Sequence, residues 1–320
     1  MKKHKSIKII KTKKEIPIFF ASDDNYVPFL AVSIKSMLEN ASKKYKYVIK
    51  VLHTNISSEN INKIKKLQTS YSDIEFVNVS KSLDTLNDKL HTCIYYTQTT
   101  YYRLFIPTLY PQYNKALYLD CDIVVRGDIS KLYNTKINNN LLGAISDQFV
   151  CYYTKVHDYI KNGLGFDKMT NYFNAGILVM NLKQLREFNF ETKFAELLQK
   201  YKFIVQDQDY LNIICKDKIH YIDESWNAQP CQENIKLENI NLIHYNLIWK
   251  PWHSEILHGE EFWKYSKLTN FAEEIKQIKD NYTKEMYQND VTNFDMFMDK
   301  IVEEGLNPNN YYNKLIRNEI

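Results

Sequence analysis

Three short apolar runs mark the first 80 residues: IPIFFA at 16–21, YVIKVLH at 47–53 and IEFVNV at 74–79. Between them, apolar residues recur at helical spacing over 27–38 and 57–67. Near-continuous apolar runs are typical of strands buried on both faces, as in a parallel sheet. The alternation of strand and helix therefore predicts an open, mostly parallel α/β sheet with right-handed crossovers.

The rest of the 320 residues continues this pattern less regularly. It predicts helices at 100–109, 182–200 and 206–215, and strands at 116–119, 141–145, 173–180 and 241–245. From about residue 260 the chain is amphipathic and helical. We expect a basic tail at 1–14, a globular α/β domain at 15–259 and a helical extension at 260–320.

The composition excludes several function classes. There are 7 glycines, where average usage would give about 22, and neither G-x-G-x-x-G nor G-x-x-x-x-G-K-[ST] occurs. A phosphate ligand must therefore be held by a metal, a Lys or an Arg. The five cysteines form no C-x-x-C pair, which argues against a disulfide framework and a zinc site and predicts a reducing cytoplasm.

The net charge of +4 comes from one end of the chain. Residues 1–14 carry seven lysines and no acid, and the remainder holds 35 basic and 38 acidic groups. This balance does not suggest a nucleic-acid-binding body. No run of 18 apolar residues occurs, so we expect no membrane span. The tail has two interpretations: a solvated segment, or a weak peripheral contact with the inner face of a membrane, at about 1 kcal/mol per basic residue.

The strongest chemical signal is YLDCDIVV at 118–125, where Asp120 and Asp122 follow a predicted strand. Carboxylates at i and i+2 point to one side of a strand, and ligands bind at the carboxyl ends of open α/β sheets. Such a pair suits Mg²⁺ or Mn²⁺. The same string also resembles the first motif of haloacid-dehalogenase-type phosphatases, but three strands precede it here.

Four further strings carry polar side chains in chemically suggestive positions. They are TTYYRL at 99–104, YFNAGILVMN at 172–181, QDQDYLN at 206–212 and IHYNLIWKPWH at 243–253. Each has an ordinary structural explanation when taken alone: a surface ion pair, a strand end, a helix cap or packed aromatics.

Taken together, and with FASDDNY at 20–26, these strings resemble glycosyltransferase family 8 from about Ile16 to His253. The bacterial lipopolysaccharide galactosyl- and glucosyltransferase branch is the more similar one, because the H-Y-x₄-K-P-W ending is retained. The resemblance implies a GT-A fold, with a single mixed, mostly parallel sheet and flanking helices, for the catalytic domain at 15–259. It also implies transfer of a hexose from a UDP-sugar with retention of configuration.

The resemblance also implies roles for individual residues. Asp120, Asp122 and His244 match the metal ligands, the metal being Mn²⁺, with Mg²⁺ as the other option, bridging the diphosphate. Asp23 and Asn25 match uridine-binding residues, and Lys250 matches the lysine that contacts the diphosphate. The positions around the donor sugar are Arg103, Asp147, Asn174, Ala175, Asp207 and Gln208.

Gln208 and Asp207 are the candidates for catalysis, and they imply different mechanisms. An amide such as Gln208 is a poor nucleophile, which favours same-face attack by the acceptor. Asp207 as a covalent nucleophile is the competing hypothesis. The acceptor is expected to be a glycan, a glycolipid or a glycoprotein. A haloacid-dehalogenase-type phosphohydrolase and a non-catalytic UDP-sugar-binding protein remain as alternative functions.

One position departs from the family pattern. The family usually has a glycine three residues after the histidine, where this chain has Leu247. A glycine there could adopt a positive φ, which leucine tolerates poorly. The sequence therefore predicts an altered loop between His244 and Lys250, and a diphosphate held chiefly by Asp120, Asp122, His244 and Lys250.

Overall fold

The structure is a computed structural model that describes residues 13–83, 90–94, 97–232 and 235–320. Most of the basic tail, residues 1–12, lies outside the described residues, so its proposed membrane contact stays a prediction.

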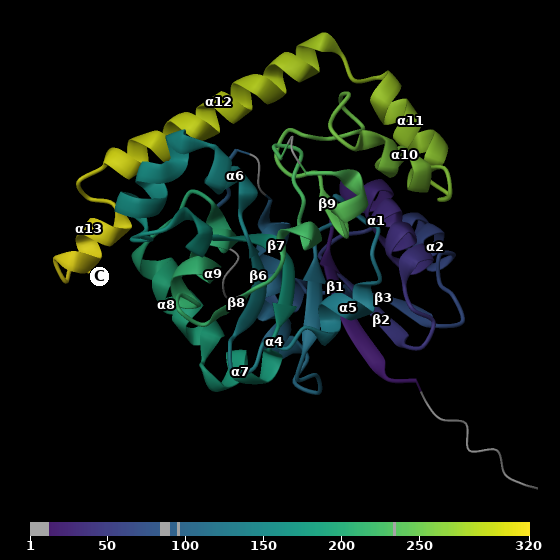
Figure 1. The fold of residues 1–320 in the computed structure, drawn as a ribbon, viewed down its shortest axis with the longest axis horizontal. Coiled ribbons are helices and arrows are strands. Elements are labelled where there is room, and N and C mark those ends of the chain that lie inside the picture. Colours follow the sequence, from purple (N-terminus) through teal and green to yellow (C-terminus); the bar gives the residue numbers. More distant parts are fainter. Residues whose placement is uncertain (1–12, 84–89, 95–96, 233–234) are drawn as a thin grey trace, which may run out of the picture.

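A seven-stranded sheet forms the centre of the molecule, in the order β3-β2-β1-β4-β7-β6-β8 (Figure 1). Parallel pairing joins β1 to β2, β2 to β3, β1 to β4 and β6 to β8, whereas β7 runs antiparallel to both β4 and β6. The predicted mixed, mostly parallel sheet is confirmed. The strands are β1 (Glu15–Ala21), β2 (Lys46–His53), β3 (Ser72–Asn78), β4 (Ala116–Leu119), β6 (Leu142–Ser146), β7 (Phe173–Met180) and β8 (Ile219–Tyr221).

A second, two-stranded sheet lies beyond the end of β4. It pairs β5 (Ile123–Val125) with β9 (Leu242–His244) in antiparallel fashion and places Ile123 opposite His244. The sequence predicted β9 but not β5. This small sheet brings the segment after the two aspartates next to the histidine that follows it by more than 100 residues.

Alternating side chains of β1 point into two separate cores. Ile16, Ile18 and Phe20 join the core beneath α1 (Val27–Asn40) and α2 (Ser58–Lys65). Phe19 and Ala21 join a core on the opposite face of the sheet, which we call the second core. Helices α4 (Ile106–Leu109), α7 (Leu182–Glu187), α8 (Phe190–Lys200) and α9 (Gln206–Ile214) cover that second face. The remaining short helices of the α/β region are α3 (Ser80–Leu83), α5 (Ile129–Asn134) and α6 (Gln148–Tyr152).

Two predicted helices differ in detail from the observed ones. The segment 182–200 divides into α7 and α8 because Asn189 adopts a left-handed conformation at φ 55°, which asparagine tolerates better than most residues. The segment 100–109 is a 3₁₀ helix, η2 (Gln98–Phe105), followed by the single turn of α4. Pro107 suits the start of that turn, because proline has no N–H to leave unpaired there.

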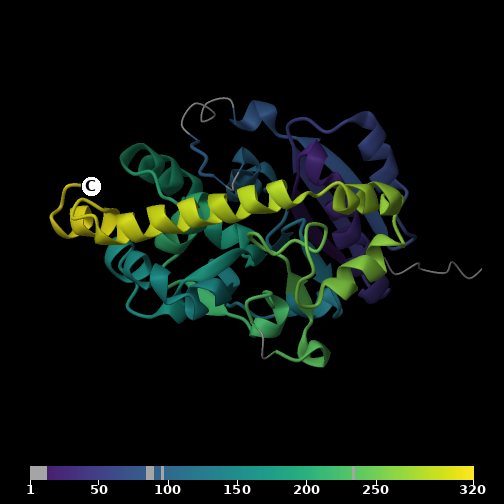
Figure 2. The same cartoon turned by 90° about the horizontal axis from the view of Figure 1, so that it is seen from above.

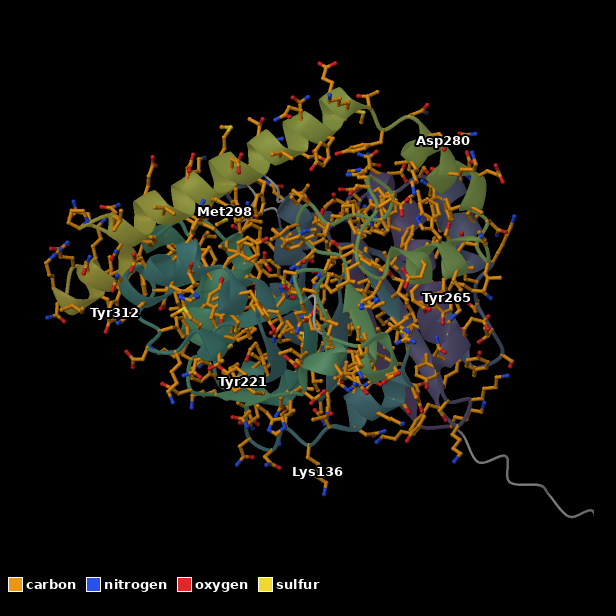
Figure 3. All side chains as sticks on the ribbon, turned by 45° about the horizontal axis from the view of Figure 1, so that its top comes forward. Lys136, Tyr221, Tyr265, Asp280, Met298 and Tyr312 are labelled. Carbon is orange, nitrogen blue, oxygen red and sulfur yellow. The ribbon has the colours of Figure 1, made fainter. Side chains whose placement is uncertain are left out.

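The predicted helical end consists of α10 (Gly259–Ser266), α11 (Ala272–Asp280), α12 (Lys284–Leu306) and α13 (Tyr311–Ile316). Helix α12 crosses the top of the molecule from α11 to α13 (Figures 1 and 2). Met298, labelled on α12 in Figure 3, is 7% exposed and belongs to the second core. Across the described ranges, none of the helices has the length and apolarity that a membrane crossing requires.

Candidate active site

A cavity of about 360 Å³ lies where β1, β4 and β9 end. It is lined by eleven of the twelve predicted site residues, the exception being Asn25. Asn25 is exposed in η1 (Asp24–Tyr26), the turn that follows β1, and lies outside the cavity lining. Residues from the six quoted strings, together with Asp147 from outside them, are therefore brought into one site.

Asp120, Asp122 and His244 form a cluster in which one ligand atom of each residue lies within 4.8 Å of the others. The His244 Nε2 atom is 3.3 Å from Oδ1 of Asp122 and 3.7 Å from Oδ2 of Asp120. Its other ring nitrogen, Nδ1, lies 2.9 Å from Oδ1 of Asn227. That contact holds the ring so that Nε2 faces the two carboxylates.

The fold explains why these three residues meet. The N–H of Asp120 donates to the carbonyl of Gly176 on β7 at 2.8 Å, and the N–H of Tyr245 donates to the carbonyl of Asp122 at 2.9 Å. A side chain at Gly176 would place its Cβ 2.5 Å from Cε1 of His244 and 2.6 Å from Oδ2 of Asp120. Gly176 is therefore required for the cluster to close.

Lys250 lies against the cluster with its ammonium group buried. Its Nζ donates to Oδ2 of Asp122 at 2.5 Å and to the carbonyl of Tyr245 at 2.7 Å. Burial alone would raise the pKa of Asp122, but the charges of Lys250 and His244 hold that pKa below its usual value. Burial opposes the ammonium form of Lys250, yet Asp122 raises its pKa, so both groups remain charged.

Arg103 is 4% exposed, so it is not the surface ion pair that an isolated arginine on a helix would suggest. Its Nη2 lies 3.1 Å from Oδ1 of Asp120, and its Nε lies 3.1 Å from Oδ2 of Asp207. The Nε–H donates to the carbonyl of Thr100, so Oδ2 of Asp207 accepts no hydrogen bond. Burial raises the pKa of Asp207 to about 6, although Arg103 opposes this.

Gln208 is held at both ends of its amide group. Its Nε2 donates to Oδ2 of Asp147 at 2.9 Å, and its Oε1 accepts from the N–H of Ala175 at 2.9 Å. Asn174 donates to both Gln208 and Asp147 at 3.3 Å. These side chains present a fixed set of amides and one carboxylate to the cavity. Such a surface can bind the hydroxyl groups of a sugar through hydrogen bonds.

Asp23 also lines the cavity; it accepts a hydrogen bond from the N–H of Tyr26 at 3.0 Å and caps η1. Asp24 does not line the cavity but binds Ser57 and Asn60 at the start of α2. The turn after β1 is thereby held by its own two aspartates.

Contrary to the altered loop predicted from the sequence, Leu247 does not avoid the left-handed conformation. Its φ is 50°, the left-handed conformation in which the family glycine was expected, and leucine occupies it. The side chain is half-buried against the second core.

Sequence reasoning missed several residues of the site. Asn227 orients His244, and Gln229 donates to Asp147 at 3.3 Å, yet both lie in a stretch without a recognisable motif. Asn246 also lines the cavity, and its buried Oδ1 has no hydrogen-bond partner. The adjacent His244 and Lys250 were the only signal that could have drawn attention to it.

This arrangement can hold a divalent cation against an anionic ligand and surround a hydroxyl-rich group. The two carboxylates are suitable ligands for Mn²⁺ and Mg²⁺, and the imidazole adds a nitrogen ligand for a divalent transition metal. Lys250 adds a positive charge beside them, and the amide network around Gln208 lies in the same cavity.

Comparison with known proteins agrees with this chemistry. Residues 17–256 match the family described as glycosyl transferase family 8. A candidate glycosyltransferase of Haemophilus influenzae is 32% identical over 75% of this chain and 74% of its own length. A lipopolysaccharide 1,2-glucosyltransferase of Escherichia coli is 26% identical over 72% of this chain and 71% of its own length.

Solved structures show the same architecture. The galactosyltransferase LgtC, determined in complex with donor and acceptor sugar analogues, superposes with a TM-score of 0.64 and 26% identity, over 80% of this chain and 96% of that one. The bifunctional glycosyltransferase WbbM gives a TM-score of 0.73 and 25% identity, over 85% of this chain. This chain spans about half of WbbM, 53% of its length. The GT-A architecture expected from the sequence is confirmed.

Proposed function

The chain belongs to glycosyltransferase family 8, and from that premise we propose that it is a metal-dependent, retaining hexosyltransferase. The donor is a UDP-sugar, UDP-glucose or UDP-galactose, and the acceptor is a glycan, a glycolipid or a glycoprotein. The observation that most directly supports this proposal is the cluster of Asp120, Asp122 and His244. It shares one cavity with Lys250 and the amide network around Gln208.

The residues present fit a divalent cation. Two carboxylates converge with an imidazole whose second nitrogen is already held by Asn227, the arrangement that metal-binding histidines favour. Asp120, Asp122 and His244 would hold the ion. Once bound there, it would neutralise the charge that develops on the diphosphate leaving group. Mn²⁺ is proposed ahead of Mg²⁺ because it is the metal that the family resemblance implies, and the two carboxylates suit either ion.

The protein's own side chains supply the rest of the catalysis. Lys250 would place its ammonium group beside the leaving diphosphate, where charge builds up as the sugar–phosphate bond breaks. Asp23 would face the uridine. Arg103 keeps Asp120 and Asp207 in place through its two ion pairs. Asp147, Asn174, Ala175 and Gln208 would orient the donor sugar through their shared hydrogen bonds.

Two observations support same-face attack by the acceptor over a covalent intermediate. Both ends of the Gln208 amide are engaged in hydrogen bonds, and an amide is a poor nucleophile. Asp207 is 3% exposed and pairs with Arg103, which lowers its reactivity. In this mechanism the leaving diphosphate takes the proton of the acceptor hydroxyl as the new glycosidic bond forms.

Mass spectrometry tests the choice between the two mechanisms. The enzyme is incubated with donor and a slow acceptor, quenched and digested. We expect unmodified Asp207. A hexosyl adduct on Asp207 would disprove same-face attack.

A UDP-release assay tests the proposed activity. UDP-glucose and UDP-galactose are each supplied with Mn²⁺ or with a chelator, and release is measured for wild type, Asp122→Asn and Asp73→Asn. We expect metal-dependent release that is lost at least 100-fold in Asp122→Asn. It should be retained in Asp73→Asn, which alters an exposed carboxylate on β3 that does not line the cavity.

The two alternative functions predict different outcomes. A haloacid-dehalogenase-type phosphohydrolase would release phosphate from small phosphoesters and carry a phosphate on Asp120; membership of family 8 argues against it. A non-catalytic binding protein would bind UDP without turnover of any donor. The predicted site residues from Asp23 to Lys250 that line the cavity are all present, which argues against that second alternative.

Where in the cell the enzyme acts is a separate proposal. We propose a cytoplasmic enzyme that meets its acceptor at the inner face of the membrane, with the lysine tail as a weak electrostatic contact. Co-sedimentation with anionic liposomes tests it on the full chain and on a chain lacking residues 1–14. Equal binding of the two would exclude the tail as the contact.

A further inference from the structure

We propose that two buried asparagines, Asn174 and Asn227, form a hydrogen-bonded relay that fixes which nitrogen of His244 carries a hydrogen. Neither asparagine is a proposed metal ligand. The family resemblance places Asn174 beside the donor sugar and gives Asn227 no role. The relay makes both of them positioning residues of the metal site, and this inference rests on the proposed metal binding by Asp120, Asp122 and His244.

The relay starts at a backbone group that can act in only one direction. The N–H of Gly176 on β7 donates to a side-chain atom of Asn174 at 3.0 Å. A backbone N–H cannot accept, so that atom must be the amide oxygen of Asn174, Oδ1. The other end of the same amide, Nδ2, faces two acceptors, Oδ2 of Asp147 and Oε1 of Gln208, each at 3.3 Å. Both ends of the Asn174 amide therefore require the same orientation.

The hydrogen-bond direction passes from Asn174 to Asn227 and then to His244. Nδ2 of Asn227 lies 3.1 Å from Oδ1 of Asn174 and donates to it. The remaining atom of the Asn227 amide, Oδ1, lies 2.9 Å from Nδ1 of His244. An amide oxygen accepts but does not donate, so Nδ1 carries a hydrogen. The neutral imidazole then has its lone pair on Nε2, the nitrogen that faces Asp120 and Asp122.

Backbone contacts hold Asn227 beside the histidine. Asn227 follows η6 (Glu224–Trp226), and the next residue, Ala228, forms a bridge to β9. The N–H of Ala228 donates to the carbonyl of Leu242 at 3.0 Å, and the N–H of His244 donates to the carbonyl of Ala228 at 2.8 Å. This segment therefore runs alongside β9, which brings the side chain of Asn227 to the ring of His244.

Water does not replace the bonds of the relay, because all three side chains are buried. Asn174 is 6% exposed, Asn227 0% and His244 2%. A buried polar group left without a partner costs about 1–3 kcal/mol, which disfavours the opposite orientation of either amide. Asn174 also makes all four of its side-chain hydrogen bonds within the protein, two through Oδ1 and two through Nδ2. A sugar hydroxyl would have to displace one of them.

The position of the hydrogen decides whether His244 can act as a metal ligand. The carboxylates of Asp120 and Asp122 lie 3.7 and 3.3 Å from Nε2, so without the relay they would favour a hydrogen on that nitrogen. A hydrogen there occupies the position that a cation needs. The bond from Nδ1 to Asn227 keeps the hydrogen on the far side of the ring, as the partners of metal-binding histidines do.

Nitrogen NMR of the metal-free protein tests the position of the hydrogen directly. The full chain is labelled with ¹⁵N-histidine and kept with a chelator at alkaline pH, where the ring is neutral. The signals of His244 are identified by their loss in His244→Gln. We expect a hydrogen on Nδ1 and none on Nε2 in wild type. A ring with its hydrogen on Nε2 would overturn the proposal.

Two variants of Asn227 and one matched control locate the cause. Asn227→Leu has a similar volume but no acceptor, so we expect the hydrogen to move to Nε2 and calorimetry to show Mn²⁺ binding about 10–100-fold weaker than in wild type. Asn227→Asp keeps an oxygen opposite Nδ1 and should keep the hydrogen there. Gln229→Leu removes a buried amide that bonds to Phe149 and Asp147 instead, and should change neither measurement. A hydrogen still on Nδ1 in Asn227→Leu, or an equal loss of Mn²⁺ binding in Gln229→Leu, would overturn the relay.

Replacement of Asn174 tests the distant link. Asn174→Leu cannot accept from Asn227, which frees that amide to turn its Nδ2 toward Nδ1 of His244. We expect the form with the hydrogen on Nε2 to appear, and Mn²⁺ binding without donor to weaken about tenfold. An unchanged hydrogen position together with unchanged Mn²⁺ binding would overturn the part of Asn174 in the relay.

The relay and the metal site can fail separately, and the wild-type spectrum decides on the relay even if a leucine variant does not fold. If Nδ1 carries the hydrogen and wild type does not bind Mn²⁺, the proposed metal site fails and the relay stands. If Mn²⁺ binds and the hydrogen lies on Nε2 in the metal-free protein, the metal site stands and the relay fails.

Discussion

Leu247 lies in the left-handed region at φ 50°, inside the loop between His244 and Lys250. A residue with a Cβ atom there costs roughly 1–2 kcal/mol relative to an unstrained conformation. The half-buried side chain offsets part of this cost by packing against the second core. The conformation of the loop is therefore fixed at its two ends. His244 belongs to β9 at one end, and Lys250 is bonded to Asp122 at the other.

Replacing Leu247 by glycine should have little effect on stability. Relief of the backbone strain and loss of side-chain burial oppose each other, so we expect the free energy of unfolding to change by less than about 1 kcal/mol. The neighbouring Ile248, also half-buried but without a positive φ, is the control, and Ile248→Gly should cost about 2 kcal/mol. Urea unfolding of both variants gives the comparison; a larger loss in Leu247→Gly would contradict the strain argument.

Asp209 should make stability depend on pH in an unusual direction. Burial raises its pKa to about 6, although the hydroxyls of Tyr159 and Tyr172 donate to it. The folded state therefore binds more protons than the unfolded state between about pH 4 and 6, and this residue's contribution to stability falls as the pH rises through that window.

The variant Asp209→Asn lacks this titration. We expect the stability difference, wild type minus variant, to shrink as the pH rises from about 4 to 6 and to stay level above 6. Urea unfolding at several pH values measures it. A difference that grows with pH in that window would show that Asp209 is stabilised as a carboxylate.

Among the secondary-structure elements, the sequence predicts well those strands that are set by a local run of apolar residues. The strands at 116–119 and 173–180 match their predicted bounds. Both are largely apolar, with Asn174 as the polar exception in the second, and each is followed by a polar residue. The direction of β7 was not predictable in this way, since its antiparallel pairing depends on β4 and β6, which are distant in sequence. Strand β5 was missed because three residues after an aspartate carry almost no periodic signal.

The residues of the site also fall into two groups, those that the sequence could identify and those that it could not. Residues in motifs, such as Asp120, Gln208 and Lys250, could be named from the sequence through a family resemblance. Asn227 and Gln229 could not, because they act on His244 and Asp147 only after the chain has folded. Likewise the residues of α12 that line the cavity belong to an ordinary amphipathic helix, and only packing shows which of its turns faces the cavity.

The docking of α12 should fail when Gly305 is given a side chain. Alanine favours a helix by about 1 kcal/mol over glycine, but its Cβ would meet the backbone of Asp158 and Tyr159 within 3.0 Å. We expect Gly305→Ala to lower the free energy of unfolding by about 1–3 kcal/mol and to speed hydrogen exchange along α12. Glu303→Ala, on the exposed side of the same turn, should do neither. A more stable Gly305→Ala protein would mean that the contact is looser than described.

At the scale of the whole molecule, occupation of the site should stabilise the fold. Ligands that bind the folded chain at 100 times their dissociation constant add about 2.7 kcal/mol, which raises the melting temperature of a domain of this size by roughly 5 °C. We expect that shift for Mn²⁺ with UDP. Mn²⁺ with UMP, which lacks the second phosphate, should give a much smaller one.

The Asp122→Asn variant should lose the shift with UDP, and a chelator should reverse it in wild type. Thermal denaturation followed by circular dichroism measures each case. Equal shifts for UDP and UMP would show that the second phosphate is not bound at the cluster.

The pairing of β5 with β9 has a further consequence for how the chain reaches its active form. Asp120 and Asp122 are placed by β4, but His244 joins them only when β9 closes a loop of about 120 residues onto β5. Such long-range closure is entropically costly and forms slowly. A chain emerging from the ribosome thus carries the two aspartates long before the histidine can reach them. In a refolding experiment, the capacity to bind a divalent cation should appear with the last strand pairing, after most of the sheet has formed.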